Sequence, residues 1–593
     1  MNQPQNATHD EMIEAQVRHI TFRSSEGDFA ICSMDRLDRK EAITAIGPLK
    51  AYHTGDRLSL VGRFETHGKY GLQFRVQMAY PIPPEDQEAI REYLINAKIR
   101  GVGPKRVDAL LELFGDETLT VITETPERLE GVSGLGASRI ERLKAAVKNQ
   151  RGRQEVMLFL YELQLSAVIA ARIWAQYQEK SKEVLEENPY RLIDEIDHFT
   201  FERADALARR LGWHSDTPER AQASLHDQLT KSYDDGHVCL PTEELTSRSL
   251  RQIGSSERVE EALRSQLAAK RLIENSDYHT ACTYQTEISQ LEAEVAREVA
   301  DRVARRFKTL SFNLDELQAL SGLTLAEAQA EAVTSASQEG LFLLTGGPGT
   351  GKTTTVKTLL ALFESHKLQV QLAAPTGRAA KRLSETTDQE AQTIHRLLDY
   401  QPLEEEFRRG ADQPLEADIV LIDEMSMVDL QLFVALLRAV PSKCRLILVG
   451  DANQLPSVGA GRVYHDLLNT EKIPTIRLSH IFRQAQESFI VVNAYQILQG
   501  HPLVSAPLDP LPDFFEVKAK SAQQAAILIE QLVTERIPDR FKIDSHDIQV
   551  ITPMYRGHCG ADQLNLRLQT LLNPEGRVIK NSSVKSKSPL KVG

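Results

Sequence analysis

Cysteine is scarce and scattered in this sequence of 593 residues. The five cysteines, Cys32, Cys239, Cys282, Cys444 and Cys559, never form a CxxC pair. That spacing argues against a disulfide framework and a cysteine zinc site, and it fits a reducing compartment. The N-terminus lacks the basic and apolar segments of a secretory signal, and no apolar run approaches the ~20 residues that span a bilayer. We therefore expect a cytoplasmic protein without a membrane partner.

An excess of basic charge is also missing. The formal net charge is −13, from 70 basic and 83 acidic residues, so the total gives no sign of a nucleic-acid partner. A locally basic groove can still bind DNA in an acidic protein. The contents of 41% hydrophobic and 26% charged residues are typical of globular domains. At roughly 150 residues per domain, the length suggests about four domains.

The residue pattern changes twice within the first half of the chain. Residues 1–83 contain apolar runs punctuated by glycine, which predicts a small OB-like β-barrel with strands at Val17–Phe22, Phe29–Met34, Arg57–Phe64 and Leu72–Met78. Residues 84–213 are predicted to be helical. Residues 214–310 are predicted to form a helical, winged-helix-like connector.

The second half has the pattern of a parallel α/β sheet. Short apolar runs alternate with helical stretches, which predicts one α/β domain at 311–472 and a second, partial one at 473–575. In the second domain we expect strands at Phe514–Val517 and Ile548–Thr552. Residues 576–593 are polar and basic without an acid, and we interpret them as a disordered tail.

The sequence GGPGTGKT, from Gly346 to Thr353, matches the phosphate-binding pattern GxxxxGK[ST]. Glycines allow successive backbone N–H groups to surround a phosphate, and the helix that follows adds the positive end of its dipole. Lys352 is expected to reach the β- and γ-phosphates and Thr353 to hold Mg²⁺. The predicted ATP-binding residues are Gly346, Gly347, Pro348, Gly349, Thr350, Gly351, Lys352, Thr353 and Thr354.

Asp423 and Glu424 directly follow the apolar run Ile419–Ile422. A carboxylate at the end of a parallel strand points into the crevice where ligands bind. We predict that Asp423 is a Mg²⁺ ligand and that Glu424 orients and deprotonates the attacking water. Such a pair can also be a helix cap with a solvated neighbour, and the P-loop upstream favours the catalytic interpretation.

Two further polar residues are candidates for the same chemistry. Gln454 follows the apolar run Leu446–Val449 and is placed to contact the γ-phosphate, although a capping loop is the alternative. Arg483 is the candidate cation for the transition state, a role that can contribute roughly 10³–10⁵ in rate. A lone arginine is more often part of a surface ion pair, and only its place in the order of motifs favours catalysis.

Two short glycine turns between helical segments predict helix-hairpin-helix units. Such turns present backbone N–H groups to a phosphate without reading sequence. The predicted contacts are Gly101, Gly103 and Lys105 in the first turn, and Gly134 and Gly136 in the second. A basic run from Arg139 to Arg153 follows. A structural turn with a solvated face, or a surface for docking proteins, is the alternative.

These motifs, in this order, resemble those of superfamily 1 DNA helicases, specifically the long stand-alone RecD-like group. The resemblance also rests on Thr324–Ala332, Ala373–Leu383, Thr393–Leu398, Gln454–Gly459, Phe482–Gln484 and Thr552–Met554. It implies that Gln329 reads adenine, and that Pro375, Thr376, Arg378, Thr393 and His395 line a single-strand DNA track. It also implies that residues 399–416 form a wedge hairpin, for which an ordinary surface loop is the alternative.

The resemblance implies an ATP- and Mg²⁺-dependent 5′→3′ DNA helicase of repair or recombination. We expect a monomer acting on single-stranded and forked DNA, with repair or single-strand-binding proteins as partners to consider. The family continues with motifs that we do not find before the tail, so we expect a C-terminally incomplete motor with weak hydrolysis and unwinding. An ATP-sensitive DNA clamp is the alternative. A P-loop kinase would need an acceptor pocket, of which the sequence gives no sign.

Overall fold

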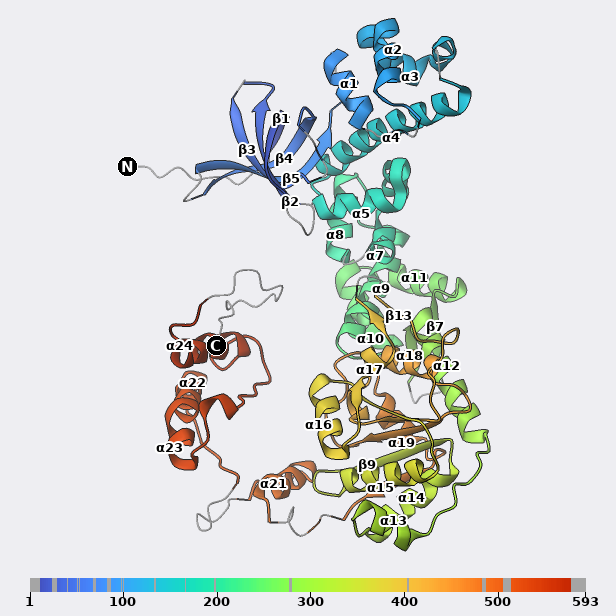
Figure 1. Cartoon of the computed structure of the whole chain (residues 1–593), viewed down its shortest axis with the longest axis vertical. Coiled ribbons are helices and arrows are strands. Elements are labelled where there is room, and N and C mark those ends of the chain that lie inside the picture. The colour runs from blue at the N-terminus through green and yellow to red at the C-terminus, as the bar shows by residue number, and fades with distance from the viewer. Residues whose placement is uncertain are drawn as a thin grey trace. The chain divides into compact units, whose positions relative to one another are not determined.

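The computed structural model describes residues 11–577, apart from 24–28, 40, 51, 53, 68–70, 83–86, 97–98, 100, 133–134, 166, 197–198, 277–279, 403–404, 481, 483–486 and 505–512. The predicted tail at 576–593 therefore lies almost wholly outside the described residues. The chain divides into two compact units. The first holds residues 1–296 with two short later segments, and the second holds the remainder (Figure 1).

The first unit begins with a closed five-stranded barrel in the order β1-β2-β3-β5-β4. Alternate residues of β2 point inward, among them Ala30, Cys32 and Met34, which produces the period of two seen in the sequence. Four strands were predicted, and β3 was missed. The strands are β1 (Glu11–Arg23), β2 (Phe29–Arg36), β3 (Ala42–Pro48), β4 (Arg57–His67) and β5 (Gly71–Pro81).

Helices follow the barrel and pack in two apolar clusters. One cluster lies within the two hairpin units around Val107, Leu110 and Leu143. The other joins Val61 and Met78 of the barrel to later helices. The helices are α1 (Gln87–Asn96), α2 (Pro104–Phe114), α3 (Thr118–Glu124), α4 (Ala137–Glu162), α5 (Ala167–Tyr177), α6 (Ser181–Glu187), α7 (Leu192–Glu195) and α8 (Phe201–Arg210).

The rest of the first unit combines helices with a small sheet. Three short strands pair in the order β6-β8-β7 beside the helices, so the predicted connector contains strand as well as helix. The elements are α9 (Pro218–Asp234), β6 (Leu240–Pro241), α10 (Thr242–Ile253), α11 (Ser256–Ala268), β7 (Leu272–Asn275), β8 (Cys282–Gln285) and α12 (Thr286–Ala304), whose second half belongs to the second unit.

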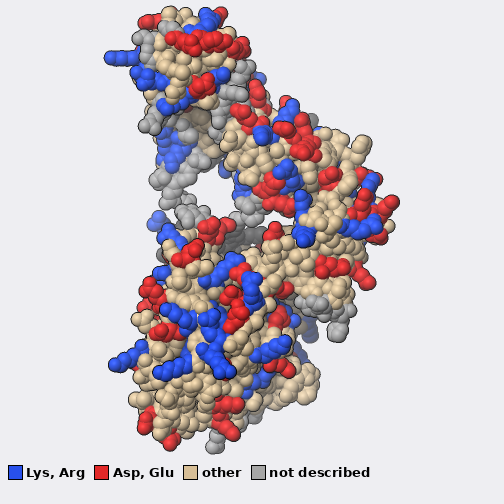
Figure 2. Space-filling view, turned by 90° about the vertical axis from the view of Figure 1, so that its right-hand side faces the viewer, with Lys and Arg blue, Asp and Glu red and all other residues tan. Residues whose placement is uncertain are grey.

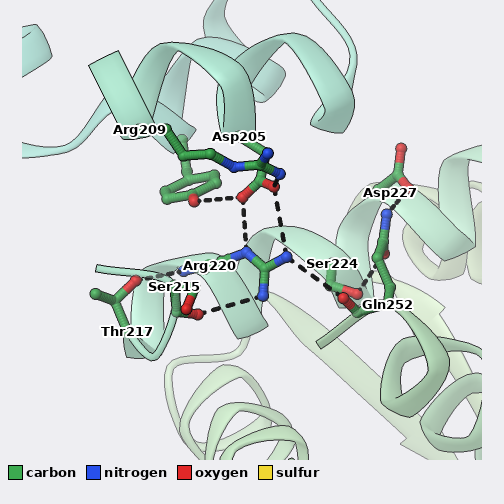
Figure 3. Close-up of polar contacts among 9 residues, drawn as sticks. Asp205, Arg209, Ser215, Thr217, Arg220, Ser224, Asp227 and Gln252 are labelled. Carbon is green, nitrogen blue, oxygen red and sulfur yellow. Dashed lines mark hydrogen bonds and ion pairs between the residues drawn. The ribbon is translucent and has the colours of Figure 1, made fainter. Parts of the chain in front are cut away.

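A buried ionic network joins α8 to α9 within the first unit (Figure 3). The Asp205 carboxylate, only 5% exposed, accepts hydrogen bonds from the Tyr190 hydroxyl at 2.8 Å, from Arg209 at 2.5 Å and from Arg220 at 2.6 Å. Burial by itself would raise the pKa of Asp205, but the hydrogen bonds from Arg220, Arg209 and Tyr190 outweigh burial and lower this pKa. The network therefore holds an ionised carboxylate inside the protein.

The second unit contains a six-stranded sheet in the order β11-β10-β14-β15-β9-β16, with parallel pairing throughout. The central strands are fully buried runs of leucine, isoleucine and valine, as expected when helices cover both faces. The strands are β9 (Leu341–Gly346), β10 (Val370–Ala374), β11 (Ala391–Thr393), β14 (Ile419–Ile422), β15 (Arg445–Gly450) and β16 (Thr475–Leu478). Strand β16 continues this sheet past the predicted domain boundary at 473.

Helices surround the sheet and continue beyond it. They are α13 (Leu314–Ser321), α14 (Glu327–Gln338), α15 (Lys352–Ser365), α16 (Gly377–Thr387), α17 (Ile394–Leu397), α18 (Leu430–Ala439), α19 (Val463–Asn469), α21 (Phe489–Leu498), α22 (Ala522–Gln531), α23 (Ile537–Phe541) and α24 (Ala561–Leu572). None of the helices in the described ranges is long and apolar enough to cross a membrane.

The strands predicted at Phe514–Val517 and Ile548–Thr552 are wrong. Both stretches are described, and neither forms a strand. Several of their apolar side chains are exposed, with Phe515 at 46% and Ile551 at 87%. An apolar β-branched run gives only a preference for extended backbone, whereas a strand also requires a neighbour to complete its hydrogen bonds.

Candidate active site

The predicted P-loop connects the buried strand β9 to α15. Gly349 and Gly351 have φ angles of 74° and 84°, a left-handed region that other residues rarely enter. At Gly351 a methyl group would lie 2.3 Å from the Gln329 side-chain nitrogen, so glycine is also required for space. The loop therefore has the backbone curvature that a phosphate-binding turn needs.

The Lys352 ammonium lies inside this loop. It donates hydrogen bonds to the carbonyl oxygens of Gly346 and Gly347, the second at 3.1 Å. The Thr350 hydroxyl donates to the Gly347 carbonyl at 2.8 Å. The ammonium thus lies at the loop, and its predicted contact with the β- and γ-phosphates stays a prediction. Pro348 is exposed, and Thr353 and Thr354 lie in the first turn of α15.

Gln329 is 1% exposed and lies against the P-loop at the start of α14. Its side-chain oxygen accepts the Ala326 N–H at 2.9 Å, and its nitrogen donates to the Gly351 carbonyl at 3.2 Å. The structure therefore brings Gln329 to the predicted nucleotide site. Whether it reads adenine remains a prediction.

The acidic pair follows β14 at the same edge of the sheet as the P-loop, because the strands are parallel. Asp423 accepts the Glu424 N–H at 2.9 Å, and Glu424 itself has a left-handed φ of 53°. Burial raises the pKa of Asp423 most strongly, the Glu424 charge adds to the rise, and the Glu424 N–H and the charges of Lys352 and Arg382 oppose it. Lys352 and Asp423 therefore interact electrostatically, as expected of residues around one ligand.

The loop after β15 lies between these two groups, because β15 is the strand between β14 and β9. The Gln454 side-chain oxygen accepts a hydrogen bond from the Ser426 hydroxyl at 2.8 Å, and Ala452 N–H donates to the Thr345 hydroxyl at 3.2 Å. Gln454 is exposed and lines a pocket with Ser426, Asp451, Ala452, Pro456, Arg462, Tyr464 and His465. The loop that carries Gln454 thus connects the acidic turn to the strand that ends at the P-loop.

Arg483 lies outside the described residues, so its catalytic role stays a prediction. The neighbouring Phe482 is described, and its N–H donates to the Gly349 carbonyl at 3.3 Å. The hydroxyl of Tyr495 on α21 also lies at the loop, because a methyl group at Gly347 would be 2.5 Å from it. Sequence reasoning missed Tyr495, since a tyrosine in an apolar helix gives no signal of a contact with a distant loop.

The predicted DNA-track residues meet at one edge of the sheet. Strand β10 pairs with β11 so that Ala374 lies opposite Thr393, which places Pro375 and Thr376 near Thr393. The hydroxyls of Thr376 and Thr393 cap α16 and α17 by accepting the N–H groups of Ala379 and Arg396, both at 3.2 Å. Both threonines thus have a structural role in addition to the predicted one.

The other two track residues make specific contacts. Arg378 is exposed and donates to the Gln549 side-chain oxygen at 2.5 Å. His395 is exposed and packs against a β-hairpin of β12 (Tyr400–Gln401) and β13 (Glu406–Phe407). Its ring centroid lies 5.4 Å from that of Tyr400 and 5.7 Å from that of Phe407. The insertion predicted at 399–416 therefore contains a hairpin fixed to the end of the track.

The two glycine turns of the first unit share one backbone pattern. The Gly103 carbonyl accepts the N–H groups of Arg106 at 2.9 Å and Val107 at 3.2 Å. The Gly136 carbonyl accepts those of Arg139 at 2.8 Å and Ile140 at 3.2 Å. Gly101 has a φ of 87°, Lys105 is exposed, and Gly134 lies outside the described residues. The geometry matches a repeated hairpin, and DNA contact there remains a prediction.

A phosphate-binding loop after one strand of a parallel sheet, with an acidic pair after a nearby strand, defines the nucleotide-binding core of a P-loop ATPase. Family models match three parts of the chain: "ATP-dependent DNA helicase YrrC, OB-fold domain" at residues 10–84, "ATP-dependent RecD2 DNA helicase HHH domain" at 149–239, and "AAA domain" at 329–460. An ATP-dependent RecD2 DNA helicase of Deinococcus radiodurans is 30% identical over 593 residues, covering 95% of this chain and 79% of the relative. The chain belongs to the RecD2 family of ATP-dependent DNA helicases.

Other known proteins match shorter stretches of the chain. The RecBCD enzyme subunit RecD of Mycolicibacterium smegmatis is 36% identical over 299 residues, which are 44% of this chain and 52% of that subunit. The crystal structure of Pif1 helicase from Candida albicans is 23% identical and covers 34% of this chain and 50% of its own, with a TM-score of 0.25. The chain thus spans about half the length of these two proteins, and the family assignment rests on the RecD2 relative.

Proposed function

We propose that this chain hydrolyses ATP to move 5′→3′ along single-stranded DNA and to separate duplex at forks, in DNA repair or recombination. The observation that carries the proposal is the convergence of Lys352, Asp423 and Gln454 on one edge of a parallel sheet that also bears Pro375, Thr376 and Thr393. A nucleotide site and a DNA track on one sheet allow hydrolysis to change the grip on DNA. The direction of movement rests on family resemblance.

Chemistry at the site would use oxygen ligands and preformed charges. The Thr353 hydroxyl and the Asp423 carboxylate would hold Mg²⁺, which neutralises developing phosphate charge. The donor set fits, because Mg²⁺ prefers oxygen ligands and because a nearby cation would offset the burial that raises the pKa of Asp423. Glu424 would orient and deprotonate water, Gln454 would contact the γ-phosphate, and Arg483 would stabilise the transition state.

The hairpin of β12 and β13 supports a wedge at the end of the track. Tyr400 and Phe407 lie opposite each other, with ring centroids 5.0 Å apart, and both contact His395. Aromatic contacts of this kind contribute about 0.5–1.5 kcal/mol each beyond simple burial. Separating a base-pair step costs about 1.4 kcal/mol on average, so a hairpin held this way is an adequate wedge when hydrolysis drives the strand past it.

DNA binding does not require a basic protein overall. Acidic and basic side chains are interspersed over the face in Figure 2, with clusters of lysine and arginine among them. Exposed Arg378, Lys105 and Arg142 supply local positive charge at the predicted contacts. Single-stranded and forked DNA are the proposed substrates, with ATP and Mg²⁺ as cofactors, and a monomer is the proposed active form.

An ATP-sensitive DNA clamp without translocation is the second candidate. It is favoured by the stretches Phe514–Val517 and Ile548–Thr552, which expose apolar side chains and form no strand. A motor needs a second lobe rigid enough to transmit force. A clamp would hold DNA in a nucleotide-dependent manner without stimulated turnover.

The deciding experiment measures ATPase activity with and without single-stranded DNA, together with unwinding of a labelled fork. The wild-type chain should show DNA-stimulated hydrolysis and unwinding, and Lys352→Ala should abolish both because it removes the phosphate-binding ammonium. Phe407→Ala should remove unwinding and keep stimulated hydrolysis, since it alters the hairpin and its contact with His395 and leaves the nucleotide site unchanged. Glu406→Ala, an exposed neighbour on the same strand, is the matched control.

Each alternative predicts a different result. DNA retention that responds to ATP, without stimulated turnover, would establish the clamp. Equal loss of hydrolysis and unwinding in Phe407→Ala would refute the wedge. Full activity in Lys352→Ala would refute the proposed nucleotide site.

A further inference from the structure

Helix α21 brings a tyrosine to the P-loop from far along the chain. The Tyr495 ring is partly buried, and its hydroxyl oxygen would lie 2.5 Å from a methyl group at Gly347. The contact is therefore with the backbone of the loop itself. None of the predicted roles at the nucleotide site uses this residue.

The surroundings of the hydroxyl are those of a phosphate site. The Lys352 ammonium donates to the Gly347 carbonyl at 3.1 Å, so the ammonium and the phenol both lie at Gly347 of the loop. Burial raises the pKa of Tyr495, and the Asp451 carboxylate raises it further. The phenol therefore keeps its proton at neutral pH and is able to donate a hydrogen bond.

The rest of α21 is hydrogen-bonded to the segment that follows it in the chain. Asn493, 1% exposed, donates to the Val504 carbonyl at 3.0 Å and accepts the Val504 N–H at 2.7 Å. At the start of the helix, Asp513 accepts the Ser488 hydroxyl at 2.5 Å and the Phe489 N–H at 2.9 Å. A shift of α21 would therefore move the following segment with it.

We propose that the Tyr495 hydroxyl donates a hydrogen bond to the terminal phosphate of bound ATP, so that α21 distinguishes a nucleoside triphosphate from a diphosphate. The inference rests on the proposed nucleotide site. When phosphate enters the loop, Lys352 leaves the Gly346 and Gly347 carbonyls for phosphate oxygens. The phenol at Gly347 is then within reach of the terminal phosphate. Release of that phosphate frees α21 and the segment attached to it.

Fluorescence titration with labelled forms of a non-hydrolysable ATP analogue and of ADP tests this contact. Tyr495→Phe keeps the ring and its packing, and it removes only the hydroxyl. It should weaken binding of the triphosphate by about tenfold or more, as expected for the loss of a hydrogen bond to a charged group. The affinity for the diphosphate should stay within about twofold of the wild-type value. Tyr555→Phe, the same change at a tyrosine that is 79% exposed, is the matched control and should match the wild type.

The outcomes separate the two proposals. An unchanged preference for triphosphate in Tyr495→Phe, with binding lost in Lys352→Ala, would overturn the Tyr495 contact alone. Equal weakening of both nucleotides, or tighter triphosphate binding, would also overturn it, since Tyr495 would then only pack on or occlude the loop. If the wild type bound neither nucleotide, the nucleotide site and the Tyr495 contact would fail together.

Discussion

Asp205 and Asp423 are both withdrawn from water, but their surroundings shift the pKa values of the two carboxyl groups in opposite directions. Asp205, in the first unit, receives hydrogen bonds from two arginines and a tyrosine, and its pKa is lowered. Asp423, at the nucleotide site of the second unit, has its pKa raised by burial, despite the charges of Lys352 and Arg382. A buried carboxylate whose charge is offset by hydrogen-bond donors of the protein itself stabilises the fold. A buried carboxylate whose charge is not fully offset by the protein can bind a cation.

The largest expected effect is a difference in the free energy of unfolding when each carboxylate is replaced by an amide. Asp205→Asn should destabilise the first unit by about 3–5 kcal/mol, because it leaves the buried Arg220 guanidinium without its carboxylate partner. Asp423→Asn should change stability by about 1 kcal/mol or less, because it removes a charge that the fold disfavours. Urea unfolding followed by tryptophan fluorescence measures the first change, since both tryptophans, Trp174 and Trp213, lie at the apolar cluster around α8.

Circular dichroism follows the second unit, which contains no tryptophan. Arg220 provides a check on the same comparison, because its side chain is 11% exposed whereas that of Arg209 is 72% exposed. Arg220→Ala should therefore cost more stability than Arg209→Ala. Equal effects of Asp205→Asn and Asp423→Asn on their own units would contradict the distinction between the carboxylates.

A smaller effect is expected from pH, with opposite signs at the two sites. The lowered pKa of Asp205 gives stability that is present above the unfolded value of about 3.9 and is lost as pH falls through the folded value. The raised pKa of Asp423 has the opposite effect. Its contribution to stability is most favourable below a pH of about 3.9 and is lost as the pH rises through the pKa of the folded state. Unfolding of each variant and the wild type from acid to neutral pH measures both trends.

The cost of Asp205→Asn should therefore shrink in acid, since the wild-type carboxyl is then neutral as well. Asp423→Asn should be as stable as the wild type in acid and should become more stable than the wild type as the pH rises. A cost of Asp205→Asn that stays constant across the acid range would mean that its ionised form does not stabilise the fold.

Local chemistry explains why most of the nucleotide site could be predicted from the sequence. The P-loop needs particular residues at fixed spacing, and Asp423 follows an unmistakable buried strand. The fold class was also predictable, because the barrel strands have a period of two and the central strands of the sheet are continuous apolar runs.

Contacts between distant residues explain the misses. Strand β3 ends at Gly47 and Pro48, which usually signal a turn. The stretches Phe514–Val517 and Ile548–Thr552 have the right composition for strands but pair with no strand in the described part of the chain. Asp205 lies in the charged sequence FERADALARR, which is typical of a solvated helix face, and only the tertiary packing of Arg220 buries it. Tyr495 was missed for the same reason.

Asp423 is predicted to take a cation that ATP brings to the loop. Calorimetric titration with a non-hydrolysable ATP analogue, with and without Mg²⁺, measures this in the wild type, Asp423→Asn and Asp205→Asn. Mg²⁺ should strengthen binding in the wild type and Asp205→Asn, and most of that gain should vanish in Asp423→Asn. A Mg²⁺-dependent gain that persists in full in Asp423→Asn would contradict the assignment of this carboxylate to the nucleotide site.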